Sequence, residues 1–116
     1  MNKYADLLHL INENPKLSVV PIVNSDVVGD DYGTWIASFG SAYVGEYTLY
    51  KDRYYDDRDD FKEAYYDYNS EALNIRFDYD PLRNKKNEKA LEKYLEEVAE
   101  KCFTKAILVN INPPDV

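Results

Sequence analysis

Apolar residues recur at helical spacing in two stretches of the chain. The first stretch predicts a helix over residues 2–13, whose apolar stripe consists of Tyr4, Leu7, Leu8 and Ile11. Asn14-Pro15 ends this helix, because the residue before a proline disfavours the helical conformation. The second stretch predicts a helix over residues 87–102 and places Cys102 in the core, on a stripe shared with Leu91, Leu95 and Val98.

Two stretches are typical of buried or half-buried β-strands. Residues 17–23 are rich in β-branched side chains, but Pro21 has no N–H to donate, so we expect an edge strand there. Residues 104–111 are apolar at consecutive positions, which predicts a central strand buried on both faces. The polar, glycine-containing residues 24–33 predict a loop.

A hairpin is predicted in the middle of the chain. Residues 34–39 and 42–50 have the composition and alternation of strands, and Gly40-Ser41 between them predicts the turn. Lys51-Asp52 then predicts a second turn, leading into a short strand at residues 53–55.

The acidic run that follows predicts the start of a helix. Aspartates in the first turn of a helix suit the positive end of its dipole, and one of them can cap it. The apolar spacing predicts a helix over residues 57–68, a break at Asn69-Ser70, and a shorter helix over residues 70–77. Tyr65 and Tyr66 cannot both face the core of one helix, so we expect at least one of them at the surface.

These elements predict a single α+β domain over residues 1–116. We expect one mostly antiparallel sheet of four or five strands, because strands and helices do not alternate as they do in a doubly wound fold. The expected helices cover residues 2–13, 57–68, 70–77 and 87–102.

Charge and tyrosine are concentrated in the middle of the chain. The 116 residues carry a formal net charge of −8, and residues 46–80 alone carry −6. Nine of the twelve tyrosines lie between Tyr43 and Tyr79. Acidic side chains repel phosphates, which argues against direct nucleic-acid binding. Tyrosine is common in protein contact surfaces, so acid and tyrosine together favour a protein-binding surface.

No pattern in the chain indicates catalysis, a metal or a cofactor. One cysteine and one histidine cannot build a zinc site of the usual kind, and the acidic run lacks the glycine of a calcium loop. The loop acids Asp26, Asp30 and Asp31 have no spacing that predicts a glycoside-cleaving pair. No apolar run is long enough for a membrane span, and a single cysteine suits a reducing compartment, so we expect a cytoplasmic protein.

Several short stretches resemble a group of short acidic proteins that phages and prophages of Gram-positive bacteria encode. The similar stretches are Val19 to Val23, Asp30 to Gly33, Ser38 to Ala42, Val44 to Tyr47, and Tyr54 to Arg58. The resemblance carries over no catalytic or binding residue. It implies an accessory protein of a mobile element that acts in the cytoplasm of a bacterial host.

We therefore expect a non-catalytic protein that binds a basic nucleic-acid enzyme of the host by imitating phosphates, in the manner of an anti-CRISPR or anti-restriction inhibitor. The expected partner-binding carboxylates are Glu46, Asp52, Asp56, Asp57, Asp59, Asp60, Glu63 and Asp67, and the expected aromatic anchors are Tyr54, Tyr55 and Tyr66. The alternative is a structural or regulatory phage protein that self-associates or binds a phage partner, partly through the strand edge at residues 17–23.

Overall fold

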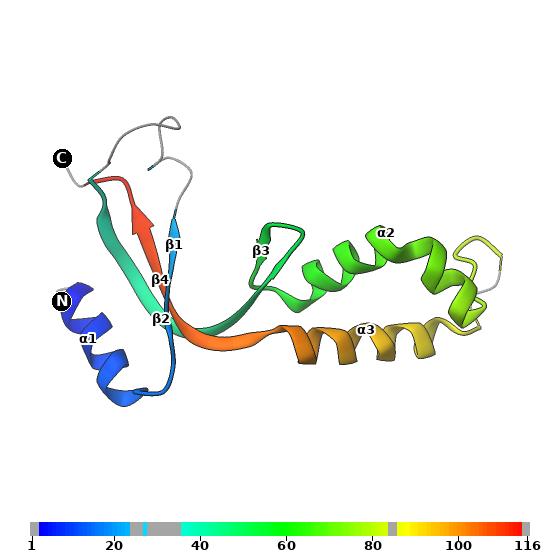
Figure 1. The fold of residues 1–116 in the computed structure, drawn as a ribbon, viewed down its shortest axis with the longest axis horizontal. Helices are drawn as coiled ribbons and strands as arrows, with labels where there is room; N and C mark the ends of the chain where they lie inside the picture. The colour runs from blue at the N-terminus through cyan, green and yellow to red at the C-terminus, as the bar shows by residue number, and fades with distance from the viewer. Residues whose placement is uncertain (1–2, 24–26, 28–35, 84–85, 115–116) are drawn as a thin grey trace. The chain divides into compact units, whose positions relative to one another are not determined.

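The computed structural model describes residues 3–23, 27, 36–83 and 86–114 (Figure 1). The predicted loop over residues 24–33 and its acids therefore lie almost entirely outside the described residues, as do Thr34 and Trp35. The elements in chain order are α1 (Lys3–Glu13), β1 (Val19–Val23), β2 (Ser38–Tyr50), β3 (Arg53–Tyr55), α2 (Arg58–Phe77), α3 (Glu88–Cys102) and β4 (Thr104–Asn112).

The predicted α+β class is confirmed, and the chain contains two compact units. The first unit combines Met1–Glu46 with Lys105–Val116, and the second is the continuous segment Tyr47–Thr104. The four strands follow the order β1-β4-β2-β3, within the expected number.

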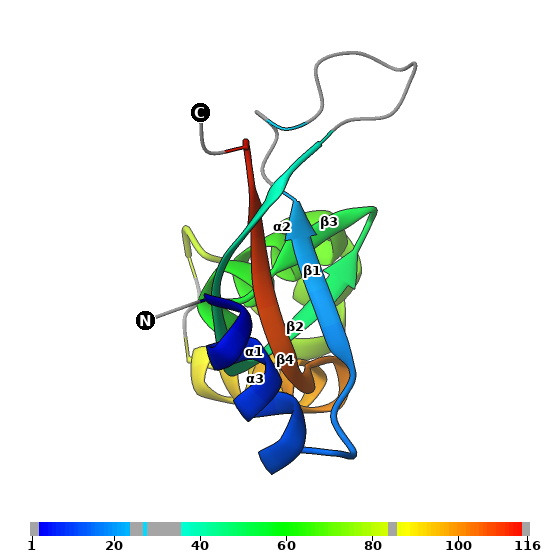
Figure 2. The same ribbon diagram turned by 90° about the vertical axis from the view of Figure 1, so that its left-hand side faces the viewer.

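The sheet is mixed, because its first pair of strands is parallel. Val19 of β1 pairs with Ile107 of β4, and the register continues in the same direction to Val23 and Ile111 (Figure 2). The other end of the order is antiparallel, with β2 and β3 paired from Thr48↔Tyr55 to Tyr50↔Arg53. We expected a mostly antiparallel sheet, and the parallel β1–β4 pair corrects this expectation to a mixed sheet.

The predictions for β4 and β1 hold in detail. β4 lies between two strands, and its residues Ala106, Ile107, Leu108 and Val109 are all buried. This burial confirms the central strand that its continuous apolarity predicts. β1 lies at the end of the strand order, so Pro21 is accommodated on an edge, as expected.

The predicted turn at Gly40-Ser41 is wrong, because β2 continues through these residues. A Cβ added to Gly40 would lie 2.5 Å from the Asn112 Nδ2 atom and 3.1 Å from the Asn110 carbonyl oxygen. The glycine therefore permits a close approach to β4 rather than a turn. The reversal of the chain comes later, at the predicted Lys51-Asp52 turn, where both residues have positive φ of 51° and 64°.

The second unit is built on two helices that lie side by side (Figure 1). Leu73 of α2 packs with Leu91 and Leu95 of α3 to form a buried cluster. The predicted helices 57–68 and 70–77 are one helix, α2, but the predicted break survives as a kink at Asn69, with φ −112° and ψ 16°.

Two predicted side-chain positions are corrected by the packing of these helices. Cys102 is exposed rather than part of the core, because the buried stripe of α3 runs through Leu91, Leu95 and Ala99. Tyr65 and Tyr66 are both half-buried, so neither is exposed. Both can be covered because α2 has neighbours on more than one side.

Candidate functional site

The predicted partner-binding residues do not form one continuous surface. Glu46 belongs to the first unit, where it is half-buried in β2, and the other ten residues belong to the second unit. Asp52 is exposed in the turn between β2 and β3. Within the second unit, the remaining residues separate into a hollow beside β3, the start of α2, and a groove between α2 and α3.

The β3 hollow brings six of the eleven predicted residues together. Its volume is about 400 Å³. The predicted residues that line it are Tyr54, Tyr55, Asp56, Asp60, Glu63 and Asp67, and Arg53 and Ala64 complete the lining. All four carboxylates are exposed to solvent.

Helix geometry explains why the α2 acids meet in this hollow. Asp60, Glu63 and Asp67 follow one another at spacings of three and four, so they share one face of α2. Asp56 joins them because it connects β3 to the start of the helix. The hollow therefore holds four carboxylates against a single guanidinium, that of Arg53.

The tyrosines of the hollow are held in place by other aromatic rings. Tyr54 stacks on Tyr47 with ring centroids 6.2 Å apart and an interplanar angle of 21°. Tyr55 meets the buried Phe61 edge-on, with centroids 6.0 Å apart, and the Arg53 guanidinium lies 5.7 Å from the Tyr55 ring. Fixed rings lose little conformational entropy when a partner binds.

The start of α2 uses two of the predicted acids for internal contacts. Asp57 is the N-cap, as the acidic run predicts, and its Oδ1 atom accepts hydrogen bonds from the backbone N–H groups of Asp59 and Asp60 at 2.8 and 3.3 Å. The Asp59 carboxylate pairs with Lys62 at 3.0 Å. Neither Asp57 nor Asp59 lines the β3 hollow.

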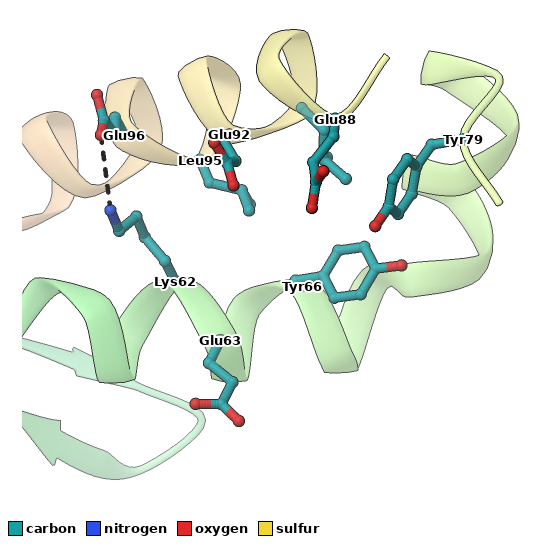
Figure 3. A pocket seen from close by; sticks show the side chains of 9 residues that line it. Lys62, Glu63, Tyr66, Tyr79, Glu88, Glu92, Leu95 and Glu96 are labelled. Atoms are coloured by element: carbon teal, nitrogen blue, oxygen red, sulfur yellow. Dashed lines mark ion pairs between the residues drawn. The ribbon is translucent and has the colours of Figure 1, made fainter. Parts of the chain in front are cut away.

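The α2–α3 groove is a second hollow, of about 420 Å³ (Figure 3). Of the predicted residues, only Tyr66 and Glu63 line it. Its other lining residues are Lys62, Tyr79, Glu88, Leu91, Glu92, Leu95 and Glu96. The sequence did not predict this groove, because glutamates on the polar face of an amphipathic helix are ordinarily exposed residues.

Tyr66 and Tyr79 form an aromatic end to the groove. Their ring centroids are 6.4 Å apart at an interplanar angle of 77°, and the Tyr66 hydroxyl donates a hydrogen bond to the Asn74 Oδ1 atom at 2.7 Å. Partial burial raises the pKa of the Tyr79 phenol above its ordinary value, and the nearby carboxylates, with Glu88 first among them, raise it further. A negative field at this end of the groove has this effect, because it opposes formation of the phenolate.

Among the described residues, no group of three or more His, Cys, Asp or Glu side chains is arranged so that it could hold a metal ion. None of the helices within residues 3–23, 36–83 and 86–114 combines the length and apolarity that a membrane crossing requires. His9 lies on α1, where its Nε2 atom is 3.1 Å from a carboxylate oxygen of Glu13, and both side chains are largely exposed.

Two hollows of the second unit, one beside β3 and one between α2 and α3, thus contain most of the predicted residues. Both are lined by carboxylates and tyrosines, and each contains a single basic residue. No family model, curated protein sequence or solved structure matches this chain.

Proposed function

We propose that this protein is a non-catalytic accessory protein of a phage or related mobile element, and that its β3 hollow binds a basic, nucleic-acid-binding protein of the bacterial host. The observation that carries the proposal is the convergence of Asp56, Asp60, Glu63 and Asp67 beside two fixed tyrosines. An inhibitor of a host defence nuclease, of the anti-CRISPR or anti-restriction type, is the class of function that this surface fits best.

The proposed mechanism is imitation of phosphates. A protein that binds nucleic acid presents lysine and arginine side chains to the phosphate backbone. Exposed carboxylates on one face of α2 offer those side chains an alternative set of anions. The surrounding net charge of the chain, −8, then speeds the encounter with a basic partner.

Tyr54 and Tyr55 supply the apolar contact area in this proposal. Both rings are half-buried, and each is already oriented by an aromatic neighbour. Aromatic side chains beside charged groups are enriched among residues that dominate binding energy. The proposal treats the acids as contacts rather than catalysts, because catalytic carboxylates are usually placed in buried or strongly perturbing surroundings, and these four are exposed.

A capture experiment followed by a competition measurement tests this proposal. Immobilised protein is incubated with bacterial lysate, eluted with a salt gradient, and the released proteins are identified by mass spectrometry. We expect a nucleic-acid-binding protein released at moderate salt, whose binding to duplex DNA the purified protein then inhibits. Capture of a partner whose DNA binding is unaffected would contradict mimicry.

Charge variants locate the contact. Asp60→Asn combined with Asp67→Asn removes two charges from the β3 hollow, and Glu71→Gln combined with Glu97→Gln removes two exposed charges from outside it. We expect association with the captured partner to slow about tenfold in the first variant and to change little in the second. Equal rates for the two variants would place the contact elsewhere.

Self-association is a second candidate function, and the first unit favours it. Most of the large exposed apolar side chains of the described residues belong to this unit, namely Tyr4, Leu8, Val19, Val23, Ile36, Phe39 and Tyr43. Ile36 is 81% exposed and Leu8 is 58% exposed. Exposed apolar surface on this scale is typical of protein contacts.

Sedimentation velocity separates this candidate from the first. If copies assemble through α1, the wild-type protein should sediment as an oligomer at high salt, and Leu8→Glu should convert it to monomers. Leu82→Glu is the matched control, because Leu82 is 92% exposed but belongs to the second unit. A monomer at all concentrations would remove the assembly candidate.

A further inference from the structure

The α2–α3 groove combines an apolar floor with an acidic rim. Leu91 and Leu95 are only 4% and 8% exposed and form the floor on the α3 side. Tyr66 and Tyr79 close one end with their rings. In Figure 3, Glu88 and Glu92 extend from α3 toward α2, and Glu88 lies near the Tyr66 and Tyr79 rings.

The rim carries far more negative than positive charge. Glu63, Glu88, Glu92 and Glu96 line the groove, and Lys62 is the only basic residue among the described ones that line it. The Lys62 ammonium lies 3.0 Å from an Asp59 carboxylate oxygen. It also lies 3.8 Å from a Glu96 carboxylate oxygen, the pair that Figure 3 marks with a dashed line. Among the described residues that line the groove, no basic side chain other than Lys62 lies near Glu88 and Glu92, so a cation from a partner would find two carboxylates there.

The Tyr79 phenol lies in the field of these carboxylates. Its pKa is raised by partial burial and then by Glu88, Tyr66 and Glu92, in that order among the first causes. Both of these carboxylates belong to α3, and they lie near the same end of the groove. A positive group placed there would be attracted by the field that disfavours the phenolate.

The size and composition of the groove fit side chains that are partly apolar and partly cationic. A volume of about 420 Å³ lies in the range of sites that bind small ligands or a few side chains. Lysine and arginine have apolar stems that can lie on leucine, and their charged ends can reach carboxylates. Arginine can also stack on tyrosine rings.

We propose that the α2–α3 groove is a docking site for a cationic, amphipathic segment of a protein partner. Leucine-like side chains and the stems of basic residues contact Leu91, Leu95 and Tyr66. The cationic ends of the basic residues pair with Glu88 and Glu92. This site does not depend on the function proposed for the β3 hollow, with which it shares only Glu63 among its lining residues.

A fluorescein-labelled peptide of alternating leucine and arginine is the probe. Fluorescence anisotropy should show saturable binding to the wild-type protein. A peptide of alternating leucine and glutamate should not bind, and one of alternating serine and arginine should bind at least tenfold more weakly. Equal binding of the leucine–arginine and serine–arginine peptides would overturn the proposal, because it would leave charge attraction alone.

Variants of the protein assign the binding to the groove. Glu88→Gln combined with Glu92→Gln should weaken binding of the leucine–arginine peptide about tenfold. Glu71→Gln combined with Glu97→Gln has the same net charge and keeps the groove, so it should bind like the wild type. Equal affinities of the two double variants would overturn the proposal.

Two further variants keep the test decisive. Glu96→Gln combined with Glu92→Gln leaves the first turn of α3 intact, and it serves if the Glu88 variant does not fold. Asp60→Asn combined with Asp67→Asn should bind the peptide like the wild type, because both residues lie outside the groove. Loss of peptide binding in that variant would place the peptide in the β3 hollow instead.

Tyr79 provides a readout that unspecific adsorption would not change. A cation docked beside Glu88 should lower the pKa of Tyr79, measured as the alkaline shift of its ring signals in NMR spectra, assigned with the Tyr79→Phe variant. At the same peptide concentration, the serine–arginine peptide should lower the pKa of Tyr79 less. An unchanged pKa of Tyr79 under saturating leucine–arginine peptide would contradict docking at this position.

Discussion

Asn69 joins the kink of α2 to the β2–β3 hairpin through the hydroxyl of Tyr50. Its side-chain Nδ2 atom donates to the Tyr50 oxygen at 3.0 Å and to the carbonyl of Tyr65, one turn earlier in the helix, at 2.9 Å. Tyr50 in turn meets Phe61 and Tyr65 with its ring, at centroid distances of 5.6 and 5.5 Å. One amide group therefore connects the irregular point of the helix to the last residue of β2.

Replacing Asn69 with alanine should destabilise the protein by about 1 kcal/mol, because both side-chain hydrogen bonds are lost. Urea unfolding of Asn69→Ala, Tyr50→Phe and the double variant measures how much of this loss belongs to the pair. We expect a coupling free energy of about 0.5–1.5 kcal/mol. Additive losses would show that the hydrogen bond between these side chains contributes nothing.

Asp57 and Asp56 are a matched pair for testing the helix cap. Asp57→Ala removes the oxygen that accepts from two backbone N–H groups and should lower the free energy of unfolding by about 1 kcal/mol. Asp56→Ala changes a neighbouring exposed acid that is not the cap, so urea unfolding should show a change within about 0.5 kcal/mol. Equal losses in the two variants would contradict the assigned cap.

Gly40→Ala tests the close approach of β2 to β4. The new methyl group would meet both Asn112 and Asn110, and we expect a loss of about 1–3 kcal/mol in thermal or urea unfolding. The nearest atom belongs to the Asn112 side chain, so adding Asn112→Ala should restore part of the loss. A stabilised Gly40→Ala variant would instead mean that the strands have room for the methyl group.

The raised pKa values of two tyrosines determine how the free energy of unfolding should change in alkaline solution. A hydrogen bond with Tyr94, followed by burial, raises the pKa of Tyr65, and partial burial followed by Glu88 raises that of Tyr79. In each case the folded-state pKa exceeds the unfolded value of about 10. The stabilisation is therefore complete below that pH and is lost as the pH rises through the folded-state pKa.

Urea unfolding across this alkaline range measures the effect. The wild-type protein should lose stability as the pH rises above about 10, and Tyr79→Phe should lose less, because one shifted group is absent. Tyr68→Phe is the control, since the Tyr68 ring is 65% exposed. A wild-type curve that rises with pH in this range would give the opposite sign and contradict both shifts.

Local patterns predicted the elements whose burial follows from neighbouring residues. β4 is apolar at consecutive positions and is central, and Asp57 caps α2 where the acidic run begins. The pairing of distant segments could not be predicted from local patterns. The parallel register of β1 on β4, and the approach of Asn112 to Gly40, depend on residues far apart in the chain. Gly40 therefore read as a turn, although it lies within a long strand.

The candidate site was predictable to the same extent. Composition indicated the candidate residues, and six of the eleven meet in the β3 hollow, but which acids share a face of α2 was not predicted. The α2–α3 groove could not be expected, because it depends on how two helices pack. Cys102 shows the same limit, since its position on a stripe placed it in the core and the packing of α3 exposes it.

The parallel pairing of β1 with β4 sets the order in which the two units can fold while the chain is being synthesised. β1 consists of Val19–Val23 and its pairing partner is Thr104–Asn112, so β1 cannot pair with β4 until residues 24–103 and β4 itself have been synthesised. The second unit, Tyr47–Thr104, is continuous and local in its contacts, and such units form early. During translation α2 and α3 should therefore fold first, and the first unit should close only after β4 has left the exit tunnel.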